Sequence, residues 1–180
     1  MALKNLLLKN QSAILKRWFN LILETYPPNT ATLMRKEKNQ FTNPVGSTIS
    51  REIEVLFKGL LEDMNSERLS APLDAILKIR SVQDFSPSQA VGFIFLLKKA
   101  IGETLKNESQ KESFLEEWLK FQSKIDELAL LAFDIYMGCR EKICEIRVNR
   151  ARAEKEMAFK MMERMTSPKE KPKKEEDSDL

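Results

Sequence analysis

The chain has 180 residues, of which 42% are hydrophobic and 32% are charged, and its formal net charge is +3. This length accommodates one domain with an appendage but not two full-sized domains, and this charge does not indicate a polyanionic partner. The sequence contains no histidine, which excludes a His-ligated haem, His-containing zinc sites and Ser-His or Cys-His nucleophile pairs.

These exclusions predict a protein that is not an enzyme and that has no catalytic, cofactor-binding or metal-binding residues. Five glycines provide little material for tight turns, so the expected fold class is all-α. No stretch of the sequence reaches the roughly 18 apolar residues that a membrane span requires. We therefore expect a cytoplasmic protein without a transmembrane segment, for which peripheral association with a membrane complex stays open.

The two cysteines, Cys139 and Cys144, fall five residues apart on a predicted helix, where their side chains diverge by about 140°. This spacing does not allow them to bridge each other or to hold a metal ion together. We expect reduced thiols, although an intermolecular link through Cys139 stays open if the helix dimerises.

Apolar residues at helical spacing predict five helices in the first part of the chain. They cover residues 3–26, 29–36, 44–64, 72–79 and 87–106. Pro27 and Pro28 end the first helix. Ser86, Pro87 and Gln89 supply a cap, a first-turn proline and a capping box for the last one, which is apolar nearly all round and should lie at the centre of the core.

Residues 113–165 predict one very long helix, because large apolar residues recur along it in steps of four and three. This seam consists of Phe114, Trp118, Phe121, Ile125, Leu128, Ala132, Ile135 and Cys139, followed by Ile143, Ile146, Arg150, Ala153 and Met157. Two consecutive four-residue steps at Cys139 form a stutter. The alternative is two ordinary helices broken near Gly138.

The expected organisation has three parts. A helical sensor-like domain covers residues 1–139, and a projecting amphipathic helix covers residues 140–166. Residues 167–180 are highly charged, contain no apolar residue except the last, and are expected to be disordered.

Two candidate sites follow from the aromatic and methionine residues. Trp18, Tyr26 and Phe41, near the turn at residues 43–46, are a possible pocket; the alternative is core packing, with the turn as a simple helix start. The possible partner or dimer surface consists of Trp118, Phe121, Ile125, Ile143, Ile146, Met157 and Met161. Methionines suit adaptable docking, but a frayed amphipathic helix end explains the last of these residues equally well.

The charged residues offer two further candidates. Arg147, Arg150 and Arg152 form a basic cluster, but glutamates are interleaved with them and aromatic residues are scarce there, so nucleic acid is not an expected partner. Arg80, Asp84 and Arg51 could pair across the domain, although solvated charges are the default expectation.

Several short motifs, taken in order, resemble one known family. They are Arg17-Trp18-Phe19, the stretch 24–27, the stretch 41–46, Ala71-Pro72-Leu73 and the stretch 82–90. This set resembles the RsbRD N-terminal domain family, named for RsbT co-antagonist proteins of bacterial stress signalling, over roughly residues 6–145. The resemblance implies a helical sensor or interaction domain. Related stressosome domains are similar to globins, bind no haem and dimerise through their helices.

The resemblance and the seam together predict a non-catalytic regulatory or adaptor protein of bacterial signalling. We expect a homodimer whose C-terminal helix passes a change of state to a separate protein, because nothing after Met165 resembles an output domain. The alternative is a structural accessory subunit that binds a larger complex, perhaps a redox or membrane-associated one, through the same helix.

Overall fold

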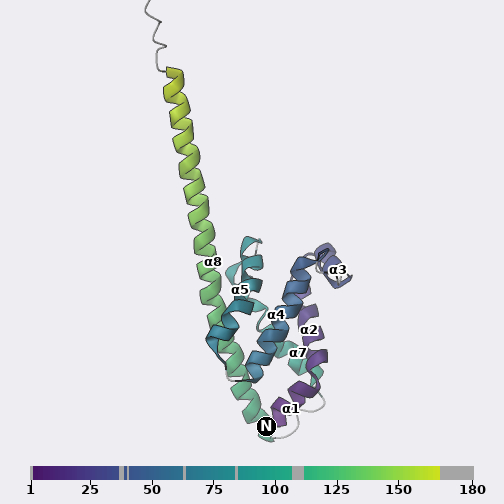
Figure 1. Ribbon diagram of the computed structural model, residues 1–180. Helices are drawn as coiled ribbons and strands as arrows, with labels where there is room; N and C mark the ends of the chain where they lie inside the picture. The colour runs from purple at the N-terminus through teal and green to yellow at the C-terminus, as the bar shows by residue number, and fades with distance from the viewer. Residues whose placement is uncertain are drawn as a thin grey trace, which may run out of the picture. The chain divides into compact units, whose positions relative to one another are not determined.

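The computed structural model describes residues 2–36, 39, 41–62, 64–83, 85–106 and 112–166; it does not describe the side chains of Ala2 and residues 112–114. The predicted disordered tail, residues 167–180, lies outside the described residues. Within the described part, the chain forms eight α-helices and no strand, which confirms the all-α prediction (Figure 1). The helices are α1 (Ala2–Lys9), α2 (Gln11–Leu23), α3 (Pro28–Lys36), α4 (Pro44–Leu61), α5 (Ser66–Val82), α6 (Pro87–Gly92), α7 (Leu96–Thr104) and α8 (Glu112–Thr166).

The start of α4 explains the turn at residues 43–46. The side chain of Asn43 is buried, its Oδ1 accepts a hydrogen bond from the Gly46 N–H at 2.9 Å, and its Nδ2 donates to the Met34 carbonyl at 2.8 Å. A Cβ atom at Gly46 would lie 2.4 Å from Asn43 Nδ2, so only glycine leaves room for this cap. The turn therefore caps α4 and ties it to the end of α3.

The fourth predicted helix is longer in the structure than the sequence pattern indicated, because α5 begins at Ser66 and continues through Pro72. Asn65 caps it, since its Oδ1 accepts from the N–H groups of Glu67 and Arg68 at 2.9 and 3.3 Å. Pro72 has no backbone N–H, so the carbonyl four residues earlier lacks its usual helical donor. That carbonyl belongs to Arg68, an exposed residue, so water can replace the missing bond.

The predicted helix over residues 87–106 is divided in the structure into α6 and α7. Across the division, backbone N–H groups bond three residues back, from Ile94 to Val91, from Phe95 to Gly92 and from Leu97 to Ile94, at 3.1 to 3.2 Å. The indole N–H of Trp18 donates to the Phe93 carbonyl at 2.7 Å. Because a tertiary donor takes this carbonyl, the chain tightens into a 3₁₀-like turn there.

A single apolar core holds these helices together. Helix α2 packs against α7 and α4, and α4 packs against α5 (Figure 1). The first part of α8 contributes Phe121, Ile125, Leu128, Ala132 and Tyr136 to the same core. Its Lys124 Nζ donates to the Glu62 carbonyl at 2.8 Å, at the end of α4.

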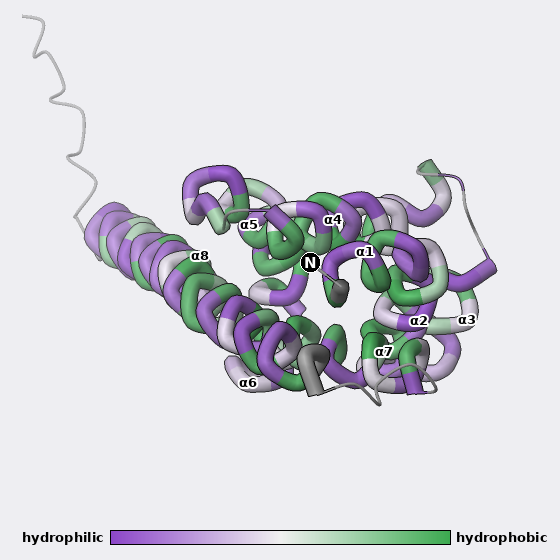
Figure 2. The backbone as a smooth tube through the Cα atoms, turned by 90° about the horizontal axis from the view of Figure 1, so that it is seen from below, coloured by the Kyte–Doolittle hydropathy of each residue, from purple (hydrophilic) through white to green (hydrophobic). Residues whose placement is uncertain are grey.

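Helix α8 is continuous from Glu112 to Thr166, so the alternative of two helices broken near Gly138 is wrong. A glycine inside a helix costs about 1 kcal/mol, and no described tertiary contact diverts the backbone at this position. Hydrophilic and hydrophobic turns alternate along α8 (Figure 2). Contacts within the chain define two compact units, Met1–Glu141 and Lys142–Leu180.

Candidate functional site

The structure buries two of the three aromatic residues of the predicted pocket and exposes the third. Trp18 is completely buried and stacks on Phe93, with ring centroids 6.5 Å apart. Tyr26 is also buried, but against Phe85, which it meets edge-on at 5.2 Å. Phe41 is 85% exposed. Trp18 and Tyr26 thus both serve core packing, and Arg80 connects them, because its guanidinium carbon lies 5.2 Å from the centre of the Tyr26 ring and 5.7 Å from that of the Phe93 ring.

The residues of the predicted partner surface divide into two groups. Phe121 and Ile125 are buried in the core of the first unit, and Trp118 packs partly buried against that core. These three positions are therefore covered by the chain itself. Ile143 is half-buried, whereas Ile146, Met157 and Met161 are 67%, 61% and 61% exposed.

Residues 142–166 form what we call the C-terminal segment, in which every described side chain except Ile143 is exposed. Its large exposed apolar residues are Ile146, Val148, Met157, Phe159, Met161, Met162 and Met165. Arg150 Nε and Glu154 Oε1, one turn apart, form an ion pair at 2.9 Å, which supports the isolated helix by a few tenths of a kcal/mol. Many apolar side chains on one exposed helix are typical of a docking element.

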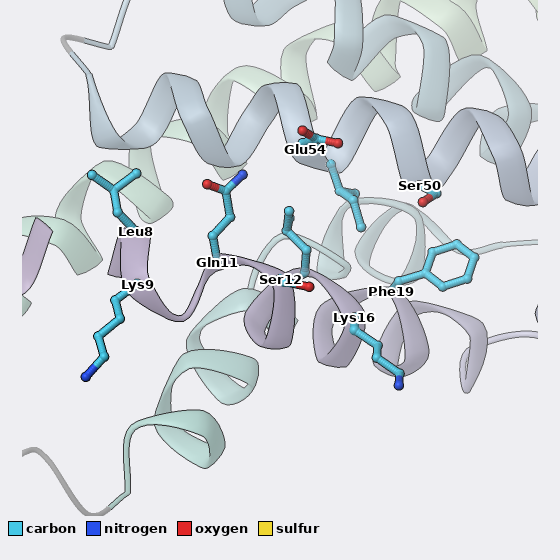
Figure 3. Close-up of a pocket in the computed structure, with 10 residues that line it drawn as sticks. Leu8, Lys9, Gln11, Ser12, Lys16, Phe19, Ser50 and Glu54 are labelled. Carbon is cyan, nitrogen blue, oxygen red and sulfur yellow. The ribbon is translucent and has the colours of Figure 1, made fainter. Parts of the chain in front are cut away.

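A groove of about 620 Å³ lies where α1 and α2 face α4 (Figure 3). Gln11 of α2 points toward α4, whereas Lys9 and Lys16 point away from it. The charged groups therefore do not converge on one point. The groove shows no arrangement that could carry catalysis or bind one specific ligand.

The most unusual group in the first unit is Arg80, near the end of α5, whose side chain is completely buried. Its Nη2 donates to Thr25 Oγ1 at 3.2 Å and to the Gln89 carbonyl at 3.1 Å, and its Nη1 donates to Tyr26 Oη at 3.4 Å. The guanidinium carbon lies 4.1 Å from the centre of the Phe85 ring. All these partners are neutral.

Burying an unpaired guanidinium is costly, since the effective penalty is several kcal/mol per ion. Contacts with aromatic faces return about 0.5–2 kcal/mol each, and hydrogen bonds from charged donors about 1.5–3 kcal/mol each. Burial lowers the pKa of Arg80, and the nearby Tyr26 only partly opposes this shift. Arg80 Nε and Gln83 Oε1 are both buried without a hydrogen-bond partner in the described structure.

A hollow of about 480 Å³ adjoins this cluster, and its lining includes several residues that contact Arg80 but not Arg80 itself. The lining residues are Thr25, Tyr26, Pro27, Thr30, Gln83, Phe85 and Gln89. None of them is acidic. Asp84, a predicted partner of Arg80, lies outside the described residues.

The default expectation that Arg80 is solvated is wrong, and a signal in the sequence could have revealed this. Arg80 follows Ile76 by four residues and Leu77 by three, so it continues the apolar stripe of α5. A residue on such a stripe faces the core whatever its charge. The pattern of α5 thus predicts a buried arginine, but it does not identify its partners.

No group of three or more His, Cys, Asp or Glu side chains in the described ranges is placed to hold a metal ion. No helix of the described chain is long and apolar enough to cross a membrane.

Comparisons with known proteins bear on the whole domain. A protein of Archaeoglobus fulgidus, described as an uncharacterized protein, is 26% identical to this chain over 155 residues, which are 86% of this chain and 93% of the relative. No solved structure matches the chain. Residues 12–151 match the family described as the RsbT co-antagonist protein rsbRD N-terminal domain. The match confirms the resemblance seen in the sequence motifs and, because it covers most of the chain, the protein belongs to this family.

Proposed function

We propose that this protein is a non-catalytic regulatory or adaptor protein of bacterial signalling, in which the helical domain forms a homodimer and the C-terminal segment docks on a separate protein. In this proposal the protein acts in the cytoplasm, and its role belongs to stress signalling, as the family description suggests. The proposal also includes a globin-like arrangement of the helices, without a bound haem. Membership of the RsbT co-antagonist N-terminal domain family is the observation that carries the proposal.

The chemistry of the C-terminal segment supports a docking role. Methionine side chains are unbranched and polarizable, so they adapt to partner surfaces of different shape. Met157 and Met161 lie one helical turn apart and both are exposed. Burying two such side chains in an interface contributes about 1.5–3 kcal/mol each.

The test is an affinity pull-down from the native host, with mass spectrometry of the captured proteins. The double variant Met157→Ser, Met161→Ser should capture the partner at least about tenfold less, since it removes about 3 kcal/mol or more of apolar contact. The matched control, Glu156→Ser, Lys160→Ser, changes two neighbouring positions of the same segment and should leave capture unchanged. Equal loss in both variants would contradict docking through the methionines.

Light scattering of the purified protein tests whether it forms a homodimer, and the pull-down shows whether its partners are captured in constant or variable amounts. A regulator should yield a free homodimer and variable amounts of signalling proteins. Recovery of one complex at constant stoichiometry, without free dimer, would instead indicate the accessory subunit.

A further inference from the structure

We propose that the outward face of the first part of α8 is the homodimer interface, on which the same face of a second copy packs with the two helices parallel. This face consists of Leu115, Leu119, Leu130, Phe133 and Met137, which we call the outer stripe. The inference rests on the proposed homodimer, and it names the surface and the orientation through which that dimer forms.

The outer stripe is a second apolar face of α8, about 130° around the helix from the face that packs on the core. Its members are separated by close to whole helical turns, so they lie along one line. All of them are exposed, and Leu130 is the most exposed at 69%. The first part of α8 lies at the outside of the helical bundle (Figure 1). The predicted partner residues Phe121 and Ile125 are buried, so the described fold leaves the outer stripe, not the seam, uncovered there.

Helix α7 and the turn before it extend this apolar face. Asp126 lies on the line of the outer stripe between Leu119 and Leu130, and its Oδ1 pairs with Lys98 Nζ of α7 at 2.6 Å. Lys98 Nζ also lies 5.6 Å from the centre of the exposed Phe95 ring. The ion pair therefore balances the charge of Asp126 and brings an aromatic ring beside the stripe. Exposed apolar patches of this kind mark interaction sites, and aromatic side chains are enriched in them.

The shape of the outer stripe favours a second α8 as its partner. From Leu115 to Met137 the stripe is about 33 Å long, at about 1.5 Å per residue, and it is narrow, so it suits another long helix with a matching stripe. The next longest described helix, α4, has 18 residues and is shorter than the stripe. A two-fold axis allows one face to serve both copies, because each residue then meets its own counterpart.

Charges beside the outer stripe determine the orientation. Glu127, Asp134 and Glu141 are exposed and recur at heptad spacing, so they form an acidic row along one edge of the stripe. An antiparallel pair would place the acidic rows of the two copies against each other, which is unfavourable. A parallel pair places the acidic row against the opposite edge, where Arg140 donates to the Ser81 carbonyl at 3.3 Å. Arg140 then lies close to the level of Glu141 of the second copy, so opposite charges meet.

The first test is the mass of the purified full-length chain, measured by light scattering over a range of protein concentrations. Leu130→Glu combined with Phe133→Glu places carboxylates from both copies inside the interface, so the Kd of the dimer should rise about hundredfold or more. The matched control, Leu33→Glu combined with Val55→Glu, changes two exposed apolar residues of α3 and α4 and should leave the Kd unchanged. All four positions are exposed, so circular dichroism should show the same helix content in both variants.

Cysteine cross-linking tests the orientation. In a Cys144→Ser background, in which the buried Cys139 remains, Leu119→Cys and Met137→Cys are prepared separately. Parallel pairing brings each new thiol beside its counterpart, so a short bismaleimide should convert both variants to covalent dimers. Antiparallel pairing allows this at one of the two levels at most. Lys120→Cys, an exposed position on another face of α8, is the control and should give several-fold less covalent dimer.

The proposal is overturned if the glutamate double variant dimerises like the unmodified chain, if only one of the two stripe cysteines cross-links, or if the control cysteine cross-links as completely as both. A dimer that persists in the double variant would leave the proposed homodimer intact and exclude only this interface, whereas a chain that is monomeric at every concentration would exclude both. Capture of docking partners through Met157 and Met161 is a separate measurement, because neither residue belongs to the outer stripe.

Discussion

Trp18 shows how one side chain organises several helices. It lies on α2, its ring stacks on Phe93, and its indole N–H bonds the Phe93 carbonyl in the turn between α6 and α7. An indole has one donor and no acceptor, so this bond satisfies it completely. The same contact anchors α2 to α7, two of the helices that pack most closely in the domain.

Replacing Trp18 by Phe keeps an aromatic ring but leaves the Phe93 carbonyl without its side-chain donor. We expect a loss of about 1–3 kcal/mol in the free energy of unfolding from the unsatisfied group, with a further loss from the smaller ring. Urea unfolding followed by circular dichroism measures it. Phe41→Ala, at an exposed position, should change stability by no more than about 0.5 kcal/mol; similar losses in both variants would refute the hydrogen-bond account.

Tyr26 should make stability depend on pH in the alkaline range. Burial raises the pKa of Tyr26, and the nearby Arg80 opposes this only in part. Unfolded tyrosine loses its proton at about pH 10, whereas folded Tyr26 keeps its proton to higher pH. Unfolding therefore releases a proton in this range, so the stabilising contribution is complete below about pH 10 and is lost as the pH rises through the folded pKa.

The comparison is between the unmodified protein and Tyr26→Phe, by urea unfolding from pH 8 to pH 11. The stability of the unmodified protein should fall more steeply above about pH 10 than that of the variant. A constant offset between the two proteins at pH 8 reflects the lost contact with Arg80. Parallel curves across the whole range would show that Tyr26 titrates alike in the folded and unfolded states.

At the level of elements, asparagine side chains cap the first turns of two helices of the domain. Asn43 and Asn65 both begin helices, α4 and α5, and both accept backbone N–H groups through Oδ1. They differ in burial, because Asn43 is buried and also donates to the Met34 carbonyl, whereas Asn65 is exposed. Asn43 thus links α3 to α4, and Asn65 serves α5 alone.

This difference predicts unequal costs for the same substitution. Asn65→Ala should cost about 1 kcal/mol, the usual value for a cap. Asn43→Ala should cost about 2–3 kcal/mol, because the buried Gly46 N–H and Met34 carbonyl both lose their partner. Thermal and urea unfolding of the two variants provide the measurement. If Asn43→Ala were no worse than Asn65→Ala, the tie between α3 and α4 would not stabilise the fold.

On the scale of the whole molecule, stability should reside in the first unit. The described hydrophobic core runs from Leu3 to Tyr136, and the C-terminal segment contributes no residue to it. Burial of apolar surface is the main source of folding free energy. The two parts of α8 therefore have different roles, although one helix contains both.

A chain ending at Glu141 should keep the unfolding free energy of the full protein within about 0.5 kcal/mol. A chain ending at Asp134 removes Tyr136, which is buried and donates to the Phe85 carbonyl at 3.4 Å, and should lose several kcal/mol. Urea unfolding at two protein concentrations measures both. A large loss on truncation at Glu141, or a stability that rises with concentration only in the full chain, would show that the C-terminal segment stabilises the fold through association.

The sequence predicted the features that depend on local patterns. The few glycines and the helical spacing of apolar residues indicated an all-α chain, and the absence of proline from residues 113–165 indicated the long helix. The capping box at Ser86 is present in the structure as predicted. These features depend on residues within one or two turns of each other, so the pattern contains the information.

The tertiary structure decided what depends on contacts between distant residues. The indole N–H of Trp18 donates to the Phe93 carbonyl, 75 residues further along the chain, in the turn between α6 and α7. No local sequence pattern indicates this contact. The apolar seam of α8 continues on both sides of the stutter at Cys139, yet Phe121 and Ile125 are buried while Ile146 and Met157 are exposed, because only packing determines which surfaces other helices cover. The surroundings of Arg80 come from α2, α5, α6 and the turns beside them. Hydrophobic periodicity is a property of one helix, whereas the environment of a buried side chain is formed where several helices meet.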